Sequence, residues 1–161
     1  MTPVLHPKPV LFAVALLGGA FSLQAAVHAA PGDVIRSLRA PSTCATGLAH
    51  HRGRLYVADH KADAIYEVDA RSGRTLRKIP TPGHRPMGLT YGKGLLWNAD
   101  YGTGWIYGLD PKTGHTRVSF EAPVRRPVAI AWGGKGLWLA ALGQSKIRLI
   151  DPEDGTTIRT T

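Results

Sequence analysis

Cysteine is almost absent from this sequence, and so is any regular pattern of amphipathic helices. Cys44 is the single cysteine in 161 residues, so no disulfide can form within the chain and noncovalent packing must hold the fold together. We interpret Cys44 as a small apolar filler rather than a nucleophile. No segment keeps a hydrophobic period of 3.6 residues, which argues against a helical domain. The 19 glycines and 12 prolines are instead typical of many short strands joined by tight turns.

Acidic residues are also scarce. The chain has 20 Lys and Arg against 11 Asp and Glu, which gives a formal net charge of +9. This excess favours an anionic small molecule, polymer or protein as the partner. No run of Lys or Arg exceeds a pair, a dispersed pattern that solvated loops and outer strands also produce. We therefore do not expect specific nucleic-acid binding.

Residues 1–29 have the features of a cleavable signal peptide. Lys8 precedes an apolar segment over 10–17, and small residues around 24–30 favour a cut after Ala29. The apolar stretch stops near Leu23, which is short for a membrane span; an uncleaved N-terminal anchor is the alternative. No cysteine stands near the cut, so a lipid anchor is not indicated. We predict a periplasmic or secreted protein whose mature chain has no transmembrane domain.

The mature part, 30–161, repeats with a period of 41 residues. Segments 46–86, 87–127 and 128–161 align without a gap, and so many matches at one offset are not expected by accident. The positions identical in all three copies are Leu55/Leu96/Leu137, Ala58/Ala99/Ala140, Ile65/Ile106/Ile147, Asp69/Asp110/Asp151, Gly73/Gly114/Gly155 and Thr75/Thr116/Thr157.

Each copy contains four short strands. Asp110 can accept hydrogen bonds from backbone N–H groups in the last turn of its copy, and Gly114 can supply the positive φ that a bulged hairpin needs. Four strands in about 41 residues is the size of one blade of a β-propeller. We therefore predict an all-β fold of three four-stranded propeller blades. In the second copy the predicted strands are 87–91, 95–100, 105–109 and 116–120.

The repeat also predicts an unfinished ring. Residues 34–38 align with 75–79, so we expect a leading outermost strand over 33–39 that lacks its three inner partners. Three blades are too few to close a ring, because about 4–8 are typical. Either the chain is the N-terminal part of a longer propeller, which we favour, or copies of itself or another chain complete the ring. Exposed apolar faces on the terminal blades would promote self-association.

The repeat motifs resemble those of the bacterial NHL/YVTN/streptogramin-lyase-like β-propeller superfamily. The resemblance rests on Gly88-Leu89, on 96–102 (LWNADYG), on Ile106-Tyr107 and on 109–114 (LDPKTG), and it extends over 32–161. These residues are structural, so the resemblance is specific for the fold and weak for function.

The resemblance implies two kinds of metal-dependent chemistry. Streptogramin lyases use a histidine after the proline that precedes an innermost strand, with a glutamate and Mg²⁺, but here Met87 and Val128 follow those prolines. Lactonase-like relatives gather a divalent metal from Glu, Asn and Asp. Asp59, Asp100 and Asn98 are the candidates for that role with Mg²⁺ or Ca²⁺, and we otherwise expect no cofactor.

Propeller ligands usually bind at the face that carries the loops before each first strand and after each second strand. Arg85 and Arg126 occupy one repeat position there, so two guanidinium groups could hold a carboxylate or phosphate. The alternative, which we favour, is that they pair with Asp59 and Asp100 and tie neighbouring blades. The candidate ligand-binding residues are Arg85, Arg126, His84, Asp59, Asp100, Tyr101 and His60.

Other conspicuous residues have simpler interpretations. The aromatic position Tyr56/Trp97/Trp138 is expected to pack between blades. His50 and His51 lie at a hairpin turn, where adjacent side chains point apart, so they are not expected to form a metal pair. The sequence contains no Ser–His–Asp arrangement, phosphate-binding glycine loop or spaced Cys/His cluster.

Three hypotheses about function remain. The favoured one is an exported, non-catalytic propeller that binds a ligand or a protein. A metal-dependent lyase or lactone hydrolase is the second, with Asp59 and Asp100 among the metal ligands. The third is a truncated fragment of a longer propeller.

Overall fold

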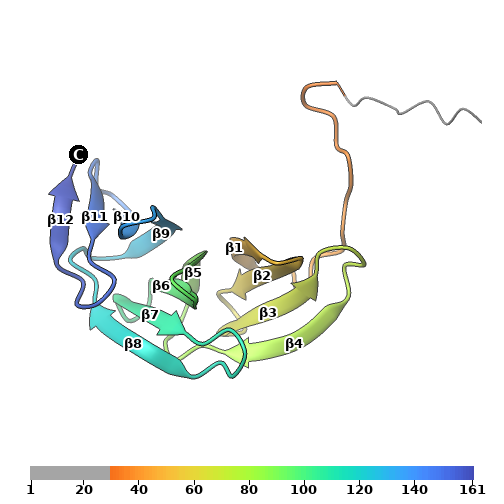
Figure 1. The fold of residues 1–161 in the computed structure, drawn as a ribbon, viewed down its shortest axis with the longest axis horizontal. Helices are drawn as coiled ribbons and strands as arrows, with labels where there is room; N and C mark the ends of the chain where they lie inside the picture. Colours follow the sequence, from red (N-terminus) through yellow and green to blue (C-terminus); the bar gives the residue numbers. More distant parts are fainter. Residues whose placement is uncertain (1–29) are drawn as a thin grey trace, which may run out of the picture. The chain divides into compact units, whose positions relative to one another are not determined.

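The computed structural model describes residues 30–161 (Figure 1), so the predicted signal peptide, 1–29, lies outside the described residues. The chain divides into two units, Met1–Arg36 and Ser37–Thr161. In the first unit, the carboxylate of Asp33 accepts a hydrogen bond from the backbone N–H of Ala30 at 2.7 Å. Within 30–161 no helix has the length and apolar character needed to cross a membrane.

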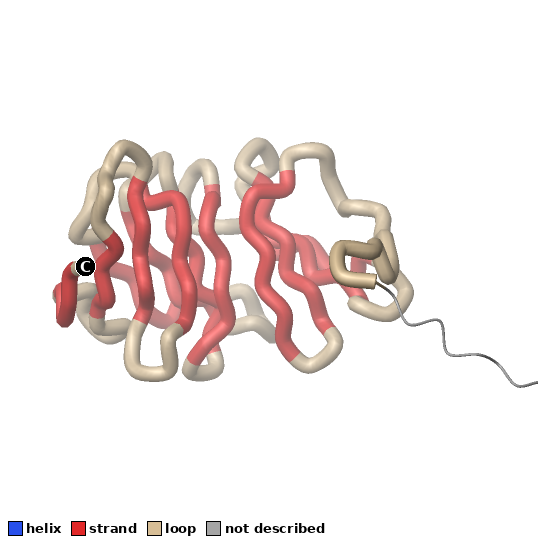
Figure 2. The backbone as a smooth tube through the Cα atoms, turned by 90° about the horizontal axis from the view of Figure 1, so that it is seen from above, coloured by secondary structure: helices blue, strands red, loops and turns tan. Residues whose placement is uncertain are grey.

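Three four-stranded antiparallel sheets make up the second unit. Each sheet follows chain order, β1-β2-β3-β4, β5-β6-β7-β8 and β9-β10-β11-β12, with β1, β5 and β9 innermost and β4, β8 and β12 outermost (Figure 1). Tan loops join the strands at both ends of the sheets (Figure 2). The strands are β1 (Ala45–His51), β2 (Arg54–Asp59), β3 (Ala64–Asp69), β4 (Thr75–Pro80), β5 (Pro86–Gly92), β6 (Leu95–Asp100), β7 (Trp105–Leu109), β8 (Thr116–Glu121), β9 (Pro127–Trp132), β10 (Leu137–Ala141), β11 (Ile147–Ile150) and β12 (Thr157–Thr160).

These sheets are propeller blades, and the fold prediction is confirmed. Blade 1 denotes β1–β4, blade 2 denotes β5–β8 and blade 3 denotes β9–β12. The four strands predicted for the second copy match β5–β8 to within one residue at each end. A repeat that buries both faces of each sheet between neighbouring sheets leaves little choice of strand register, which explains why the sequence pattern located the strands so closely.

The last turn of each blade has the predicted construction. In blade 2, one carboxylate oxygen of Asp110 accepts hydrogen bonds from the N–H groups of Lys112 at 2.8 Å and Thr113 at 3.2 Å. Gly114 has a φ of 79°, which a residue with a Cβ adopts only at a cost. The equivalent positions behave alike, since Asp69 and Asp151 accept from the same turn and Gly73 and Gly155 have φ of 74° and 79°.

The apolar core lies between adjacent blades. Leu96 and Leu137, two members of one repeat position, are fully buried. Trp97 is buried as well, and its indole N–H donates to the carbonyl of Gly92 at 2.9 Å. The aromatic position therefore serves packing in blade 2, as predicted. Burial of these large side chains on both faces of β6 is what holds blade 2 between its neighbours.

Glycines let neighbouring blades approach closely at the innermost strands. A Cβ on Gly47 of blade 1 would come within 2.6 Å of the carbonyl oxygen of Met87 in blade 2. A Cβ on Gly88 of blade 2 would come within 2.9 Å of the backbone nitrogen of Ile130 in blade 3. Gly47 and Gly88 occupy the same repeat position in consecutive blades, so the two contacts between blades are built in the same way.

The predicted leading strand over 33–39 does not form. The described part of the chain has no strand before Ala45, because an extended segment without an inner neighbour has no ladder of hydrogen bonds to join. Its last apolar residue nevertheless takes the expected place. Leu38 lies over Gly73, with a side-chain carbon 3.2 Å from the Cβ position, as Ile79 lies over Gly114 and Phe120 over Gly155.

Candidate ligand-binding groove

A groove of about 840 Å³ crosses all three blades where their innermost strands begin. Two repeat positions supply most of its lining. One is the second residue of each first strand, and the other is the residue after each second strand. Lys61 and Arg85 complete the groove. The two repeated sets are Thr46/Met87/Val128 and His60/Tyr101/Leu142.

Backbone hydrogen bonds fix the two loops that meet at this groove. The N–H of Tyr101 donates to the carbonyl of Arg85 at 3.1 Å, and the N–H of Leu142 donates to that of Arg126 at 3.0 Å. In blade 1 the equivalent bond joins His60 to Cys44 at 3.4 Å. The loop before each first strand is therefore tied to the loop after each second strand, which brings these sequence-distant residues together.

Arg85 is held by its backbone, not by an ion pair. Its N–H donates to the carboxylate of Asp63 at 2.9 Å, and the ring of His84 lies 3.3 Å from the other carboxylate oxygen. The Arg85 N–H is the main cause that lowers the pKa of Asp63, with His84 adding to it. Because Asp63 is on the loop of the preceding blade, it fixes the position of Arg85 across the junction between blades 1 and 2.

Both arginines of this repeat position have left-handed backbone conformations. The φ of Arg85 is 64° and that of Arg126 is 55°, an uncommon region for a residue with a Cβ. Each arginine precedes a proline that begins a first strand. Strained backbone of this kind persists where the surrounding structure requires it, and it gathers at binding sites.

The favoured prediction of an Arg–Asp network between blades is wrong. Among residues 30–161, no salt bridge joins Arg85 or Arg126 to Asp59 or Asp100. The carboxylates are occupied by their own turns. Asp59 accepts from the N–H of Lys61 at 2.8 Å, and Asp100 accepts from the N–H of Thr103 at the same distance. Local backbone donors thus take the place that the arginines were expected to fill.

The two buried carboxylates titrate in opposite directions. Burial tends to raise the pKa of Asp59, but hydrogen bonds, those from the N–H groups of Lys61 and Ala62 among them, outweigh it and lower that pKa. For Asp100, burial dominates over the Thr103 hydrogen bonds and raises the pKa. Asp100 Oδ2 is buried and has no hydrogen-bond partner within 30–161.

The seven predicted site residues are divided by the structure. Arg85, His60 and Tyr101 line the groove. His84, which directly precedes Arg85 in the sequence, is exposed and does not line it. Arg126 instead lines a second recess of about 380 Å³, together with Tyr101 and Arg125. Asp59 and Asp100 are buried and line neither space.

The apolar lining of the groove was not among the predicted site residues. Met87, Val128 and Leu142 contribute it, with Thr46 at the blade 1 end. A signal for it was present in the sequence, because Met87 and Val128 each follow the proline that begins a first strand. The sequence prediction for that position was the absence of a histidine base, not a lining residue of the groove.

The metal candidates do not fit a metal centre. Within residues 30–161, no three or more His, Cys, Asp or Glu side chains are grouped to hold an ion. Asn98 donates to the carbonyl of Gly88 at 3.0 Å, and Asp59 is committed to its turn. Asn98 Oδ1 and Asp100 Oδ2 are buried without a hydrogen-bond partner within 30–161, but Asp100 has no group of carboxylates or imidazoles around it that could complete a site.

Comparisons with known proteins identify the fold. Glutaminyl cyclase from Myxococcus xanthus is similar with a TM-score of 0.64 and 20% identity, over 72% of this chain and 51% of that one. Virginiamycin B lyase from Staphylococcus aureus has a TM-score of 0.57 and 24% identity, over 70% of this chain and 40% of that one. The computationally designed Ika4 protein has a TM-score of 0.61 and 19% identity, over 81% of this chain and 79% of that one.

These similarities define the class of protein as a β-propeller. They support the fold only and assign no activity or ligand to this chain. The chain spans about half of the glutaminyl cyclase chain and 39% of a similar Kuenenia stuttgartiensis hydrazine synthase chain. No protein-family model and no curated protein matches the sequence.

Proposed function

We propose that this protein is an exported β-propeller module that binds an anionic ligand in the groove across its three blades. One observation carries the proposal. The groove lining contains three basic residues, His60, Lys61 and Arg85, and no acidic residue. On a propeller, ligands are bound by side chains on the loops and not by the blade cores, and these three come from such loops.

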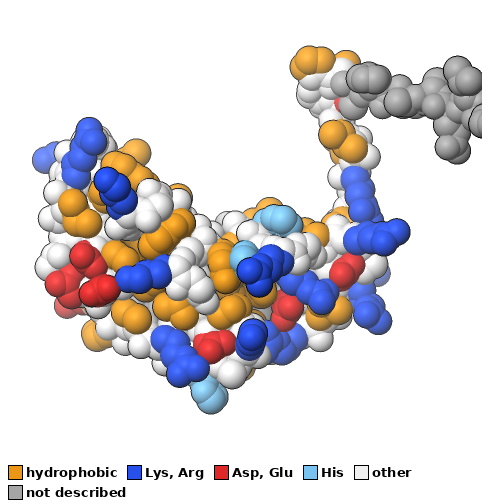
Figure 3. Space-filling model, viewed as in Figure 1, with side chains coloured by type: hydrophobic (Ala, Val, Ile, Leu, Met, Phe, Trp, Pro, Cys, Tyr) orange, Lys and Arg blue, Asp and Glu red, His pale blue; other side chains and the backbone are white. Residues whose placement is uncertain are grey.

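The basic groups of the groove are available for a ligand. Among residues 30–161, the Arg85 guanidinium forms no salt bridge, and neither does Lys61. A guanidinium can bind a carboxylate or phosphate with two parallel hydrogen bonds, and a nearby ammonium adds a point charge. Lys and Arg are also spread over all three blades on the face drawn in Figure 3, which would attract an anion from a distance.

The rest of the lining restricts the ligand further. Met87, Val128 and Leu142 present apolar side chains to the same space, and Tyr101 adds an aromatic ring with a hydroxyl. A ligand that fills the groove would therefore combine an anionic group near Arg85 with an apolar body toward blade 3. We propose membership of the NHL/YVTN/streptogramin-lyase-like superfamily on the repeat motifs, and a binding function without catalysis.

Titration calorimetry with octanoate and with inorganic phosphate tests the proposal, because octanoate has both features and phosphate has only the charge. Octanoate should bind more tightly than phosphate. The double variant Arg85→Gln/Lys61→Gln should weaken octanoate at least about tenfold, since each charged hydrogen bond contributes about 1.5–3 kcal/mol. Arg126→Gln is the matched control, because it removes the same charge from the same repeat position outside the groove. If neither anion bound, or if Arg126→Gln weakened binding equally, the groove would not be the site.

Export is a separate part of the proposal. A cut after Ala29 would give a mature chain that begins at Ala30. Mass spectrometry of the protein from the periplasmic or culture fraction should find that terminus. Recovery of the chain from the cytoplasm with residues 1–29 attached would contradict export and leave the groove proposal unaffected.

A further inference from the structure

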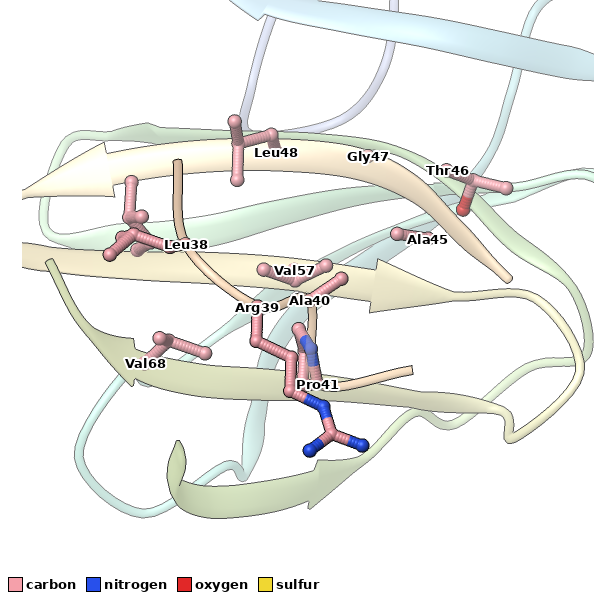
Figure 4. A pocket seen from close by; sticks show the side chains of 11 residues that line it. Leu38, Arg39, Ala40, Pro41, Ala45, Thr46, Gly47, Leu48, Val57 and Val68 are labelled. Carbon is pink, nitrogen blue, oxygen red and sulfur yellow. The ribbon is translucent and has the colours of Figure 1, made fainter. Parts of the chain in front are cut away.

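The first blade has an apolar face that its counterparts bury. Leu48, Leu89 and Ile130 occupy one repeat position on the first strands of the three blades. Leu89 is 5% exposed and Ile130 is 8% exposed, because each packs on the preceding blade, whereas Leu48 is 63% exposed. A recess of about 280 Å³ opens beside Leu48, with Val57 and Val68 of blade 1 and residues 38–41 of the same chain in its lining (Figure 4).

The third blade exposes the complementary face, the one that blades 1 and 2 bury against the blade that follows them. Gly47 and Gly88 are buried, because the following blade covers them with Leu89 and Ile130 respectively. Ala129, at the same repeat position in blade 3, is exposed. The described chain therefore makes one kind of interface twice internally, and presents its two unpaired halves at Leu48 and at Ala129.

We propose that a second copy of this chain supplies the missing partner, with blade 3 of each copy packed on blade 1 of the other. Each of the two junctions would continue the packing that joins blades 1 and 2 and blades 2 and 3. Two copies with three blades each would close a ring of six, within the range of about 4–8 that propellers adopt. Because the contact is head to tail and the ring closes, association stops at the dimer.

The outermost place at this junction is already filled. Leu38 covers Gly73 of blade 1 as Ile79 covers Gly114 of blade 2. The repeat assigns the same place to Thr161 of the docking copy, which follows β12. Leu38 is apolar like Ile79 and Phe120, and the residues of β12 are all exposed. In the dimer Leu38 therefore keeps this place, and Thr161 of the docking copy is excluded from it.

Ala129 makes the new junction looser than the internal ones. The internal glycines sit where a Cβ would come within 2.6 to 2.9 Å of the next blade. The methyl group of Ala129 must hold the docking blade slightly farther away, so the dimer should dissociate reversibly on dilution. Thr46 lines both the groove and the recess beside Leu48, whereas Lys61 and Arg85 line the groove only. The variant Arg85→Gln/Lys61→Gln should therefore weaken anion binding and keep the dimer, so the two proposals can fail independently.

Sedimentation velocity of the purified protein over a range of concentrations tests the proposal. The unmodified chain should approach the mass of two copies, and Leu48→Lys should raise the dissociation constant at least about tenfold by placing a charge in an apolar contact. Ala129→Trp should do the same from the other face by steric block. Trp105→Lys is the matched control: it places a lysine on blade 2, at the repeat position where blade 3 has Lys146, and should leave the dimer intact.

A mixture of the two defective variants distinguishes head-to-tail packing from other contacts. Leu48→Lys keeps a sound blade 3 face and Ala129→Trp keeps a sound blade 1 face, so the mixture should form a heterodimer through one junction that neither variant forms alone. Both positions are exposed, so circular dichroism should show that each variant folds. A monomer at every concentration for the unmodified chain, an unaffected dimer in Leu48→Lys, or a mixture without heterodimer would each overturn the proposal.

Discussion

The α-carbon of Gly83 lies against the buried carboxylate of Asp100. A Cβ at Gly83 would come within 2.6 Å of both Cγ and Oδ2 of that side chain. The loop of blade 1 and the second strand of blade 2 can approach this closely only because residue 83 has no side chain. The same closeness leaves Asp100 Oδ2 without a hydrogen-bond partner within 30–161.

Gly83→Ala should therefore lower the free energy of unfolding by roughly 1–3 kcal/mol, the usual cost of overpacking a filled site. Urea denaturation would measure the loss. The third repeat suggests the compensating change, because it combines Val124 with Ala141 at the equivalent positions. Gly83→Ala/Asp100→Ala should recover part of the lost stability relative to the sum of the single changes. Additive losses would show that the two residues do not interact.

Asp100 should make stability depend on pH in the direction opposite to most carboxylates. Burial raises its folded-state pKa above the ordinary value of 3.8, so ionisation favours unfolding. This penalty is absent below the unfolded pKa and grows as the pH rises through the folded pKa. Asp100→Asn removes it, so the free energy of unfolding of the variant relative to the unmodified protein should increase between pH 3.5 and pH 7. A constant difference across that range would contradict the assignment.

Asp110 should behave in the opposite way. The hydrogen bond from Arg117, followed by those from the turn, lowers the pKa of Asp110 from 3.8 to about 2. Its stabilising contribution is then complete above pH 3.8 and is lost as the pH falls through about 2. Arg117→Gln should raise the Asp110 pKa toward the ordinary value and move this loss to higher pH. An NMR titration of the Asp110 carboxyl would measure the shift, with Asp154, which has no arginine partner in its described contacts, as the internal reference.

The contrast between Asp110 and Asp59 explains which features the sequence could predict. The turn at Asp110 involves residues within three positions in sequence, so its residue types were enough to identify it. Asp59 also has backbone N–H donors in its own turn, but the prediction paired its carboxylate with an arginine from another loop. In the structure the carboxylate accepts hydrogen bonds from the turn instead. The distant partner of Arg85 depends on how two neighbouring blades are placed. A single sequence does not give the distance between residues on different blades.

Leu38 illustrates the same limit from the other side. The 41-residue period assigned it to an outermost strand, and the structure places its side chain where that strand would put it, yet without the strand. Side-chain packing needs only the neighbour beneath, Gly73, whereas a strand needs a hydrogen-bonded partner along its length. The repeat predicted the position of the Leu38 side chain correctly. It could not predict that the backbone, without hydrogen bonds to an inner strand, would not form a strand.

Arg77 should contribute more to the junction between blades 1 and 2 than its half-buried position suggests. It bonds to Glu67 of its own blade at 2.9 Å and donates to the carbonyls of Pro111 and Lys112 in blade 2. Arg77→Met keeps the aliphatic stem but removes these donors, so it should cost about 1–2 kcal/mol of unfolding free energy.

Arg54→Met is the matched control, because Arg54 pairs with Glu67 and Asp69 inside blade 1 only. Such a partly exposed pair contributes at most about 1 kcal/mol. Thermal and urea unfolding of both variants would measure the two losses. Equal losses would mean that Arg77 acts only through Glu67 and that the bonds to blade 2 add nothing to the cohesion of the blades.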